Sequence, residues 1–153
     1  MKFIRYLFQF FFTVLTTFKP NKFHPLVWIT GEPSIGKNVH IGAFSEVSCL
    51  GSYVTIGNNC DIAAFVSINC ADSHKLCLGI KSFVERRDII IGKNVFIGSH
   101  SIIKGGAIIG DFSVIAAGTV VDGVEIPAYS LVFGNPMHVK KEYYKKQLKK
   151  NAI

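Results

Sequence analysis

The sequence predicts an all-β chain folded as a parallel β-helix of six-residue repeats, and three observations support this. Aliphatic residues recur at every sixth position, the residue after each of them is usually small, and 14 glycines are spread at intervals along the chain. A period of six matches neither the period of about 3.6 of an amphipathic helix nor simple alternation. Each hexapeptide is therefore expected to form one short strand and one corner.

The aliphatic positions fall into three runs: Ile29, Ile35, Ile41, Val47; then Leu50, Ile56, Ile62, Ile68; then Ile91, Ile97, Ile103, Ile109, Ile115 and Val121. If three hexapeptides close one triangular coil, these side chains stack into an internal column of four to five coils. A meandering β-sandwich would not keep a period of six from 91 to 121. Corners are expected at asparagines, which tolerate left-handed conformations: Asn38, Asn58 and Asn94.

The 153 residues fit one domain, and a content of 49% hydrophobic and 18% charged residues favours a packed core over a disordered chain. We expect an apolar helix and lead-in at 1–28, the β-helix at 29–127, and a cap with a short basic helix or tail at 128–153.

The N-terminal segment at 3–18 is apolar apart from Arg5 and Gln9. It is shorter than the roughly 20 residues that span a bilayer, and no small-residue cleavage site of a signal peptide follows it. Two interpretations stay open: a helix packed on the body or its oligomer, and an amphipathic helix in peripheral contact with a membrane.

Two interruptions break the period of six. The register slips by three between Val47 and Leu50, and the interval from Ile68 to Ile91 is five positions longer than three hexapeptides. The segment at about 70–88 is therefore expected to leave the coil as a loop, and chemistry is often found on such loops.

The formal charge is +7, and residues 138–153 hold six lysines and one acid. A basic tail can serve a phosphorylated cofactor, an anionic membrane or nucleic acid, but no nucleic-acid recognition motif accompanies it, so nucleic-acid binding is not predicted. The four cysteines have neither disulfide-scaffold nor zinc-site spacing, which favours reduced thiols and a cytoplasmic location.

The segment IIGKNVFIGSHSIIKGGAIIGDFSVIAAGTVVDG at 90–123 closely resembles the hexapeptide-repeat acyltransferases, in particular the sugar O-acetyltransferases such as galactoside and maltose acetyltransferase. The likeness extends more loosely from about 29 through GNPMHVKK at 134–141. It implies a left-handed β-helix, a homotrimer, and an acetyl-CoA site between neighbouring subunits. Handedness comes from this resemblance, because the general crossover rule would favour the opposite hand.

Members of this family carry a catalytic histidine near the loop, and the resemblance places His74 there as general base, within Ala-Asp-Ser-His-Lys. Imidazole suits that role, since an ordinary pKa of about 6.5 lets it take a proton from a hydroxyl or amine at neutral pH. Asp72 could orient the ring.

The resemblance also implies that small residues at one coil edge line the pantetheine arm of acetyl-CoA: Gly98, Ser99, Ala117 and Gly118. Where relatives place Thr-Lys to hold a phosphate, this chain has Asp122-Gly123, so Lys140 and Lys141 are the expected phosphate ligands. The acceptor-binding residues of galactoside acetyltransferase fall on Ala43 and Gly51, which argues against a plain galactoside acceptor. No metal ligand is predicted.

The function expected is O-acetylation of a sugar or a cell-envelope glycan precursor. N-acetylation of a nucleotide-linked amino sugar and a non-catalytic scaffold remain alternatives. A γ-type carbonic anhydrase shares the architecture but needs three zinc-bound histidines, and the five histidines here lack its closely paired spacing.

Overall fold

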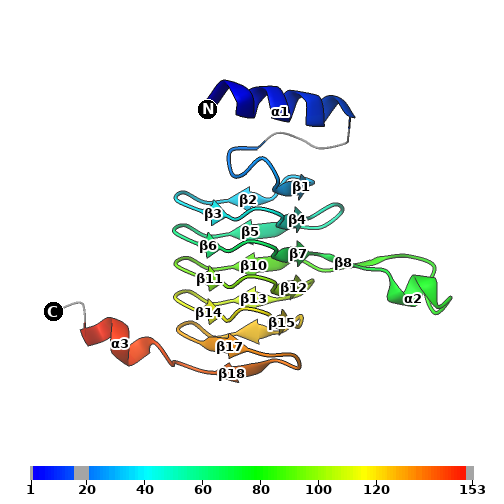
Figure 1. Ribbon diagram of the computed structural model, residues 1–153. Helices are drawn as coiled ribbons and strands as arrows, with labels where there is room; N and C mark the ends of the chain where they lie inside the picture. The colour runs from blue at the N-terminus through cyan, green and yellow to red at the C-terminus, as the bar shows by residue number, and fades with distance from the viewer. Residues whose placement is uncertain (1, 16–20, 151–153) are drawn as a thin grey trace.

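The computed structural model describes residues 2–15 and 21–150, and its body is a solenoid of short parallel strands (Figure 1). Each coil contributes one strand to each of three sheets, which we call faces A, B and C. Face A contains β1 (Trp28–Thr30), β4 (Glu46–Ser48), β7 (Ser67–Asn69), β12 (Ile102–Lys104) and β15 (Val120–Val121). Face B contains β2 (Ser34–Ile35), β5 (Val54–Ile56), β10 (Ile89–Ile91), β13 (Ile108–Ile109) and β16 (Glu125–Ile126).

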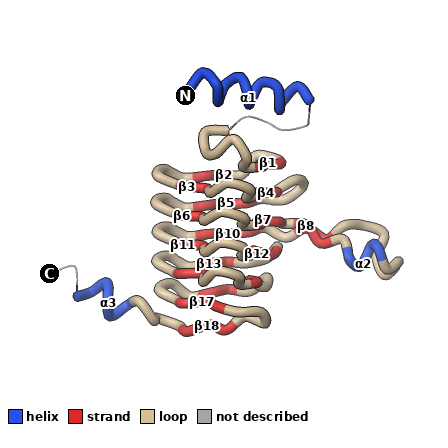
Figure 2. Tube along the Cα trace, viewed as in Figure 1, coloured by secondary structure: helices blue, strands red, loops and turns tan. Residues whose placement is uncertain are grey.

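Face C contains β3 (His40–Ile41), β6 (Asp61–Ile62), β11 (Phe96–Ile97), β14 (Val114–Ile115), β17 (Leu131–Phe133) and the antiparallel end strand β18 (His138–Lys140). Strand structure therefore continues past residue 127. Helix α1 (Lys2–Leu15) lies at the first coil, and α3 (Lys145–Lys150) follows the last (Figure 2). The all-β prediction with a parallel β-helix is confirmed.

An aliphatic column fills the interior. On face C, Ile62 pairs with Ile97 and Ile97 with Ile115, so one isoleucine lies above another from coil to coil. The column side chains from coil to coil are almost completely buried, namely Ile41, Ile56, Ile62, Ile68, Ile91, Ile97, Ile103, Ile109, Ile115, Val121, Ile126 and Val132. Ile29 and Ile35, in the first coil, are partly buried against it.

One predicted column position is wrong. Leu50 is 61% exposed, on the corner that joins face A to face B. The chain between Val47 and its partner Ile68 is longer than the chain between Ile91 and its partner Ile109 in a regular coil. The additional residues lengthen the corner, where Gly51 adopts a positive φ of 71°, and leave both walls in register.

The corners use left-handed backbone conformations. Between faces B and C these residues are Asn38, Asn59, Asn94, Phe112 and Tyr129. Asn59, and not the predicted Asn58, has the positive φ, because the carboxamide oxygen of Asn58 accepts the backbone N–H of Lys37 at 2.7 Å. Between faces C and A, the rings of Phe44, Phe65 and His100 stack with centroids 5.0 and 4.9 Å apart.

A mutation in the column tests this packing. We expect Ile97→Ala to lower the free energy of unfolding by about 2–5 kcal/mol, because it leaves a cavity between two coils. Leu50→Ala is the matched control and should change stability by no more than about 0.5 kcal/mol, since Leu50 contributes little to the interior. Chemical denaturation at one fixed protein concentration measures both, and equal effects of the two substitutions would contradict the assigned interior.

Candidate functional site

An arm leaves the solenoid at the corner between faces A and B and projects away from it (Figures 1 and 2). It consists of β8 (Ala71–Asp72) and β9 (Glu85–Arg86), which pair antiparallel, and the single-turn helix α2 (His74–Cys77). Ile56 pairs with Ile91 across it, an interval nearly twice as long as the regular coil from Ile91 to Ile109. The excursion therefore holds almost a whole coil of additional sequence, well above the surplus of five positions counted from the period.

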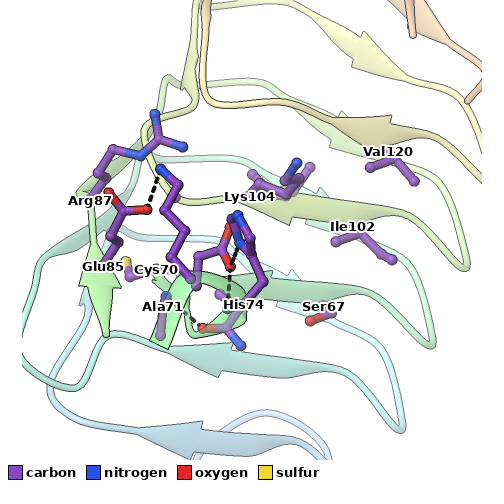
Figure 3. Close-up of a pocket in the computed structure, with 14 residues that line it drawn as sticks. Ser67, Cys70, Ala71, His74, Glu85, Arg87, Ile102, Lys104 and Val120 are labelled. Atoms are coloured by element: carbon purple, nitrogen blue, oxygen red, sulfur yellow. Dashed lines mark hydrogen bonds and ion pairs between the residues drawn. The ribbon is translucent and has the colours of Figure 1, made fainter. Parts of the chain in front are cut away.

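A pocket of about 660 Å³ lies between the arm and face A. Figure 3 shows Ser67, Ile102 and Val120 along the sheet on one side, Glu85 and Arg87 on the other, and His74 between them. The pocket thus combines an apolar and hydroxyl-bearing floor with a charged wall from the arm.

His74 and Asp72, the predicted catalytic pair, both line this pocket. One carboxylate oxygen of Asp72 lies 2.5 Å from Nδ1 of His74 and also accepts the backbone N–H of His74 at 3.2 Å. The hydrogen bond from the His74 ring, followed by that from its backbone, lowers the pKa of Asp72 below its usual value. An ionised Asp72 can only accept a proton from Nδ1, so the neutral ring keeps its lone pair on Nε2.

A second cluster ties the arm together. Glu85 on β9 lies 2.8 Å from the Lys75 ammonium and 2.5 Å from that of Lys81. The hydrogen bond from Lys75, then that from Lys81, lowers the pKa of Glu85 to about 2. These ion pairs join α2 and its following turn to the returning strand.

Sequence reasoning missed Lys75, Glu85, Arg87 and Lys104, which also line the pocket. Arg86-Arg87 comes directly before the period resumes at Ile89–Ile91, and this adjacent pair was the available signal. Cys70 lies in the same pocket, but burial raises the pKa of its thiol, so at neutral pH it is a poor nucleophile.

The predicted pantetheine residues lie at the opposite edge of face A, at the corner between faces C and A. There the Gly118 N–H donates to the Ser99 carbonyl at 2.9 Å, and an added Cβ on Gly98 would lie 2.5 Å from the Ala117 nitrogen. An added Cβ on Gly118 would meet no atom within 4 Å. The corner is therefore close-packed at Gly98 and open at Gly118, as an extended chain passing over it would require.

None of Gly98, Ser99, Ala117 and Gly118 lines the pocket of His74. A second groove of about 660 Å³, lined by Trp28, Glu46, Phe65 and His100 among others, lies along the same corner, and Ser67 borders both cavities. Face A thus separates and connects the two predicted parts of the site.

The predicted phosphate ligands Lys140 and Lys141 do not line either cavity. Lys140, on β18, has its ammonium 5.3 Å from the Phe133 ring centroid and 5.8 Å from that of Tyr143. Their role in binding acetyl-CoA stays a prediction. Among the described residues, no three His, Cys, Asp or Glu side chains gather where they could hold a metal ion.

The repeats match the family model described as "Hexapeptide repeat of succinyl-transferase" at residues 34–70 and 88–123, and the interval between the two matches is the arm. These repeats fit the left-handed form of the β-helix. No curated protein matches the chain.

Solved structures with this fold include sugar acetyltransferases. The polySia specific acetyltransferase NeuO is 31% identical, with 78% of this chain and 59% of NeuO covered and a TM-score of 0.63. A maltose O-acetyltransferase from Clostridium difficile 630 is 29% identical, with 74% and 69% covered and a TM-score of 0.55. This chain therefore spans less than two thirds of the length of NeuO.

AntD, an N-acyltransferase from Bacillus cereus, shares the fold at 21% identity, with 87% of this chain and 79% of AntD covered and a TM-score of 0.68. That structure is a complex with dTDP-4-amino-4,6-dideoxyglucose and coenzyme A.

The ion pairs of Glu85 give a testable pH dependence of the arm. Because the pKa of Glu85 falls from 4.5 to about 2 in the folded chain, its stabilisation of the arm is complete above pH 4.5 and is lost as the pH falls toward 2. We expect Glu85→Gln to speed amide exchange across residues 74–81 at pH 7 and to remove this dependence.

Hydrogen exchange followed by mass spectrometry, corrected for intrinsic rates, measures the effect. Glu142→Gln, which removes an ion pair with Lys145 outside the arm, is the control and should leave 74–81 unchanged. Exchange that is equally slow in Glu85→Gln and wild type would show that these pairs do not hold the arm.

Proposed function

Because the chain is a hexapeptide-repeat protein with the fold of sugar acetyltransferases, we propose that it transfers an acetyl group from acetyl-CoA to a hydroxyl of a sugar or cell-envelope glycan precursor. The observation that carries the proposal is the contact between Asp72 and Nδ1 of His74, in a pocket large enough for a sugar. The acetyl donor supplies a thioester, an acyl group activated toward attack by a hydroxyl.

In this proposal His74 is the general base. Asp72 holds the Nδ1 proton, so Nε2 takes the proton of the acceptor hydroxyl as that oxygen attacks the acyl carbon. Asp72 also stabilises the imidazolium that forms, because it stays ionised with a lowered pKa. The side chain of His74 is 56% exposed, which leaves the ring accessible to a bound acceptor.

The donor would lie along the corner of Gly98, Ser99, Ala117 and Gly118. Backbone groups and small side chains there leave room for a pantetheine arm, and the open space at Gly118 supports this placement. His74 lies at the other edge of face A, so a complete site needs either a donor that crosses this face or a neighbouring copy that brings its own edge. We favour the second arrangement, a homotrimer with sites between subunits.

Substitution of the catalytic pair tests this function. In a thiol-release assay with acetyl-CoA and a panel of sugars and sugar nucleotides, His74→Ala should lower kcat by about 10²- to 10⁴-fold, because no base remains to accept the proton. Asp72→Asn should lower kcat as well, since an amide can donate to the ring and favour the wrong tautomer. His40→Ala, an exposed histidine on face C, is the control.

Unchanged kcat in His74→Ala would remove this residue from the mechanism. Mass spectrometry of the product linkage separates O-acetylation from N-acylation of an amino sugar. Turnover in the wild type with no member of the panel, together with failure to bind CoA, would favour a non-catalytic scaffold.

Helix α1 is oriented with its apolar side outward. Gln9 is only 8% exposed, Phe12 packs edge-on against Trp28 with ring centroids 6.2 Å apart, and Thr13 is partly buried. Large apolar side chains occupy the exposed positions, which are Phe3, Ile4, Tyr6, Leu7, Phe8, Phe10, Phe11, Val14 and Leu15. Among residues 2–15 and 21–150, no helix is long and apolar enough to cross a membrane.

We propose that this outward side binds an anionic lipid surface. The first acid of the sequence is Glu32, whereas Lys2, Arg5, Lys19 and Lys22 precede it, so the N-terminal segment carries net positive charge. An apolar face flanked by basic residues favours insertion at the boundary between headgroups and acyl chains.

Vesicle binding tests this contact. We expect co-sedimentation with vesicles containing phosphatidylglycerol, weaker binding to pure phosphatidylcholine, and at least about tenfold weaker partitioning for the Phe3→Ser/Phe10→Ser variant, which loses two buried aromatic rings. Tyr53→Ser, at an exposed position on the solenoid, is the control. Undiminished binding of the double variant, or a change in its oligomeric state in place of its lipid binding, would contradict the proposal.

A further inference from the structure

The charged groups around the pocket are paired unevenly. Asp72 bonds to His74, Glu85 to Lys75 and Lys81, and Asp122 to Lys104 at 2.8 Å. Arg87 also lines the pocket, yet no carboxylate of the described residues lies within 4.0 Å of its guanidinium. The pocket therefore holds a permanent cation whose charge no neighbouring side chain neutralises.

Arg86, the adjacent residue, shows what a structural arginine does in this arm. Its Nε donates to the Leu50 carbonyl at 2.8 Å, and its Nη1 donates to the Val84 carbonyl at 3.5 Å. These bonds fasten β9 to the lengthened corner of the preceding coil. Within the described residues Arg87 makes no such side-chain bond to the protein, and only its backbone N–H is used, donating to the Cys70 carbonyl at 3.1 Å.

The guanidinium of Arg87 lies over two glycines of successive coils. An added Cβ on Gly106 would lie 3.2 Å from Nη1, and one on Gly123 would lie 3.0 Å from Nη2. A side chain at either position would push the guanidinium away, and Gly106, with a φ of 92°, also adopts a conformation that disfavours other residues. The chain thus provides a seat for this cation at the edge of face A.

Phosphate is the ligand chemistry that fits such a group. A guanidinium presents several N–H donors in a planar fork that matches phosphate oxygens, and it stays charged at every physiological pH. The pocket side of Arg87 is exposed and lies in the same cavity as His74, so a phosphate bound there would be held close to the reacting groups.

We propose that Arg87, seated over Gly106 and Gly123, binds a phosphate group of a substrate at the pocket of His74. The inference rests on the proposed acyl transfer for the identity of the phosphate carrier, which is either CoA or a nucleotide-linked acceptor. It assigns to the arm the phosphate contact that sequence reasoning sought in Lys140 and Lys141.

Calorimetric titration of the full-length protein tests the proposal, with CoA, dephospho-CoA, dTDP and inorganic pyrophosphate as probes. The variants are Arg87→Gln and Arg87→Lys, and Arg86→Gln is the matched control. Loss of one charged hydrogen-bonding group should weaken binding of the contacted phosphate by about 10- to 100-fold in Arg87→Gln, less in Arg87→Lys, and not in Arg86→Gln.

The pattern of losses identifies the source. Weaker binding of CoA but not of dephospho-CoA assigns Arg87 to the 3′-phosphate, and equal weakening of both, with pyrophosphate also affected, assigns it to the diphosphate of CoA. Weaker binding of dTDP alone assigns it to a nucleotide-linked acceptor. All three results support the proposal.

Two results would overturn it. If wild type binds CoA and Arg87→Gln binds every probe equally well, the Arg87 site is wrong while the acyltransferase proposal stands. If wild type binds no CoA, the acyltransferase proposal fails. In that case Arg87-dependent binding of pyrophosphate still supports a phosphate site, and its absence removes that too.

Discussion

The structure depends on the stacking of one aliphatic side chain on the next in each face of the solenoid. Every coil must place its inward residue directly over that of the coil before, as Ile103 lies over Ile68 and under Val121. A slip of one residue on any face would turn that column outward. Corners carry their own constraint, since buried hydroxyls such as Ser101 and Thr119 bond to the Ala116 carbonyl, and no buried side-chain polar atom of the described residues lacks a partner.

This constraint determines where additional sequence can go. Residues inserted within a strand would break the register of three faces, whereas residues inserted at a corner change only the path between two strands. The lengthened corner at Gly51 and the arm at 71–86 both lie between faces A and B, in successive coils, and Arg86 bonds the second to the first through the Leu50 carbonyl. The site is therefore built where the solenoid tolerates insertion.

Period and resemblance together predicted the β-helix, the column and the local pair of Asp72 and His74. These succeed because the determinants are local: six-residue spacing for the coils, and a separation of two positions for the catalytic pair. Leu50 was misplaced because an apolar residue at the expected spacing looks the same whether it faces inward or lies on a longer corner. The arm was underestimated because a period cannot show how many residues leave a coil before it resumes.

Arg87 could not be found in this way, because its place depends on contacts between distant parts of the chain. Gly106 and Gly123 follow it by one coil and by two, and only the stacking of coils brings them beneath the guanidinium. Loss of a cation at Asp122-Gly123 directed attention to the nearest lysines in sequence, whereas the structure offers one from the preceding coil. In a solenoid each surface position has neighbours one coil away, so a side chain lost from one coil can be replaced from the next. The arm is well placed for such an exchange, because it is free of the register that fixes every other residue around the pocket.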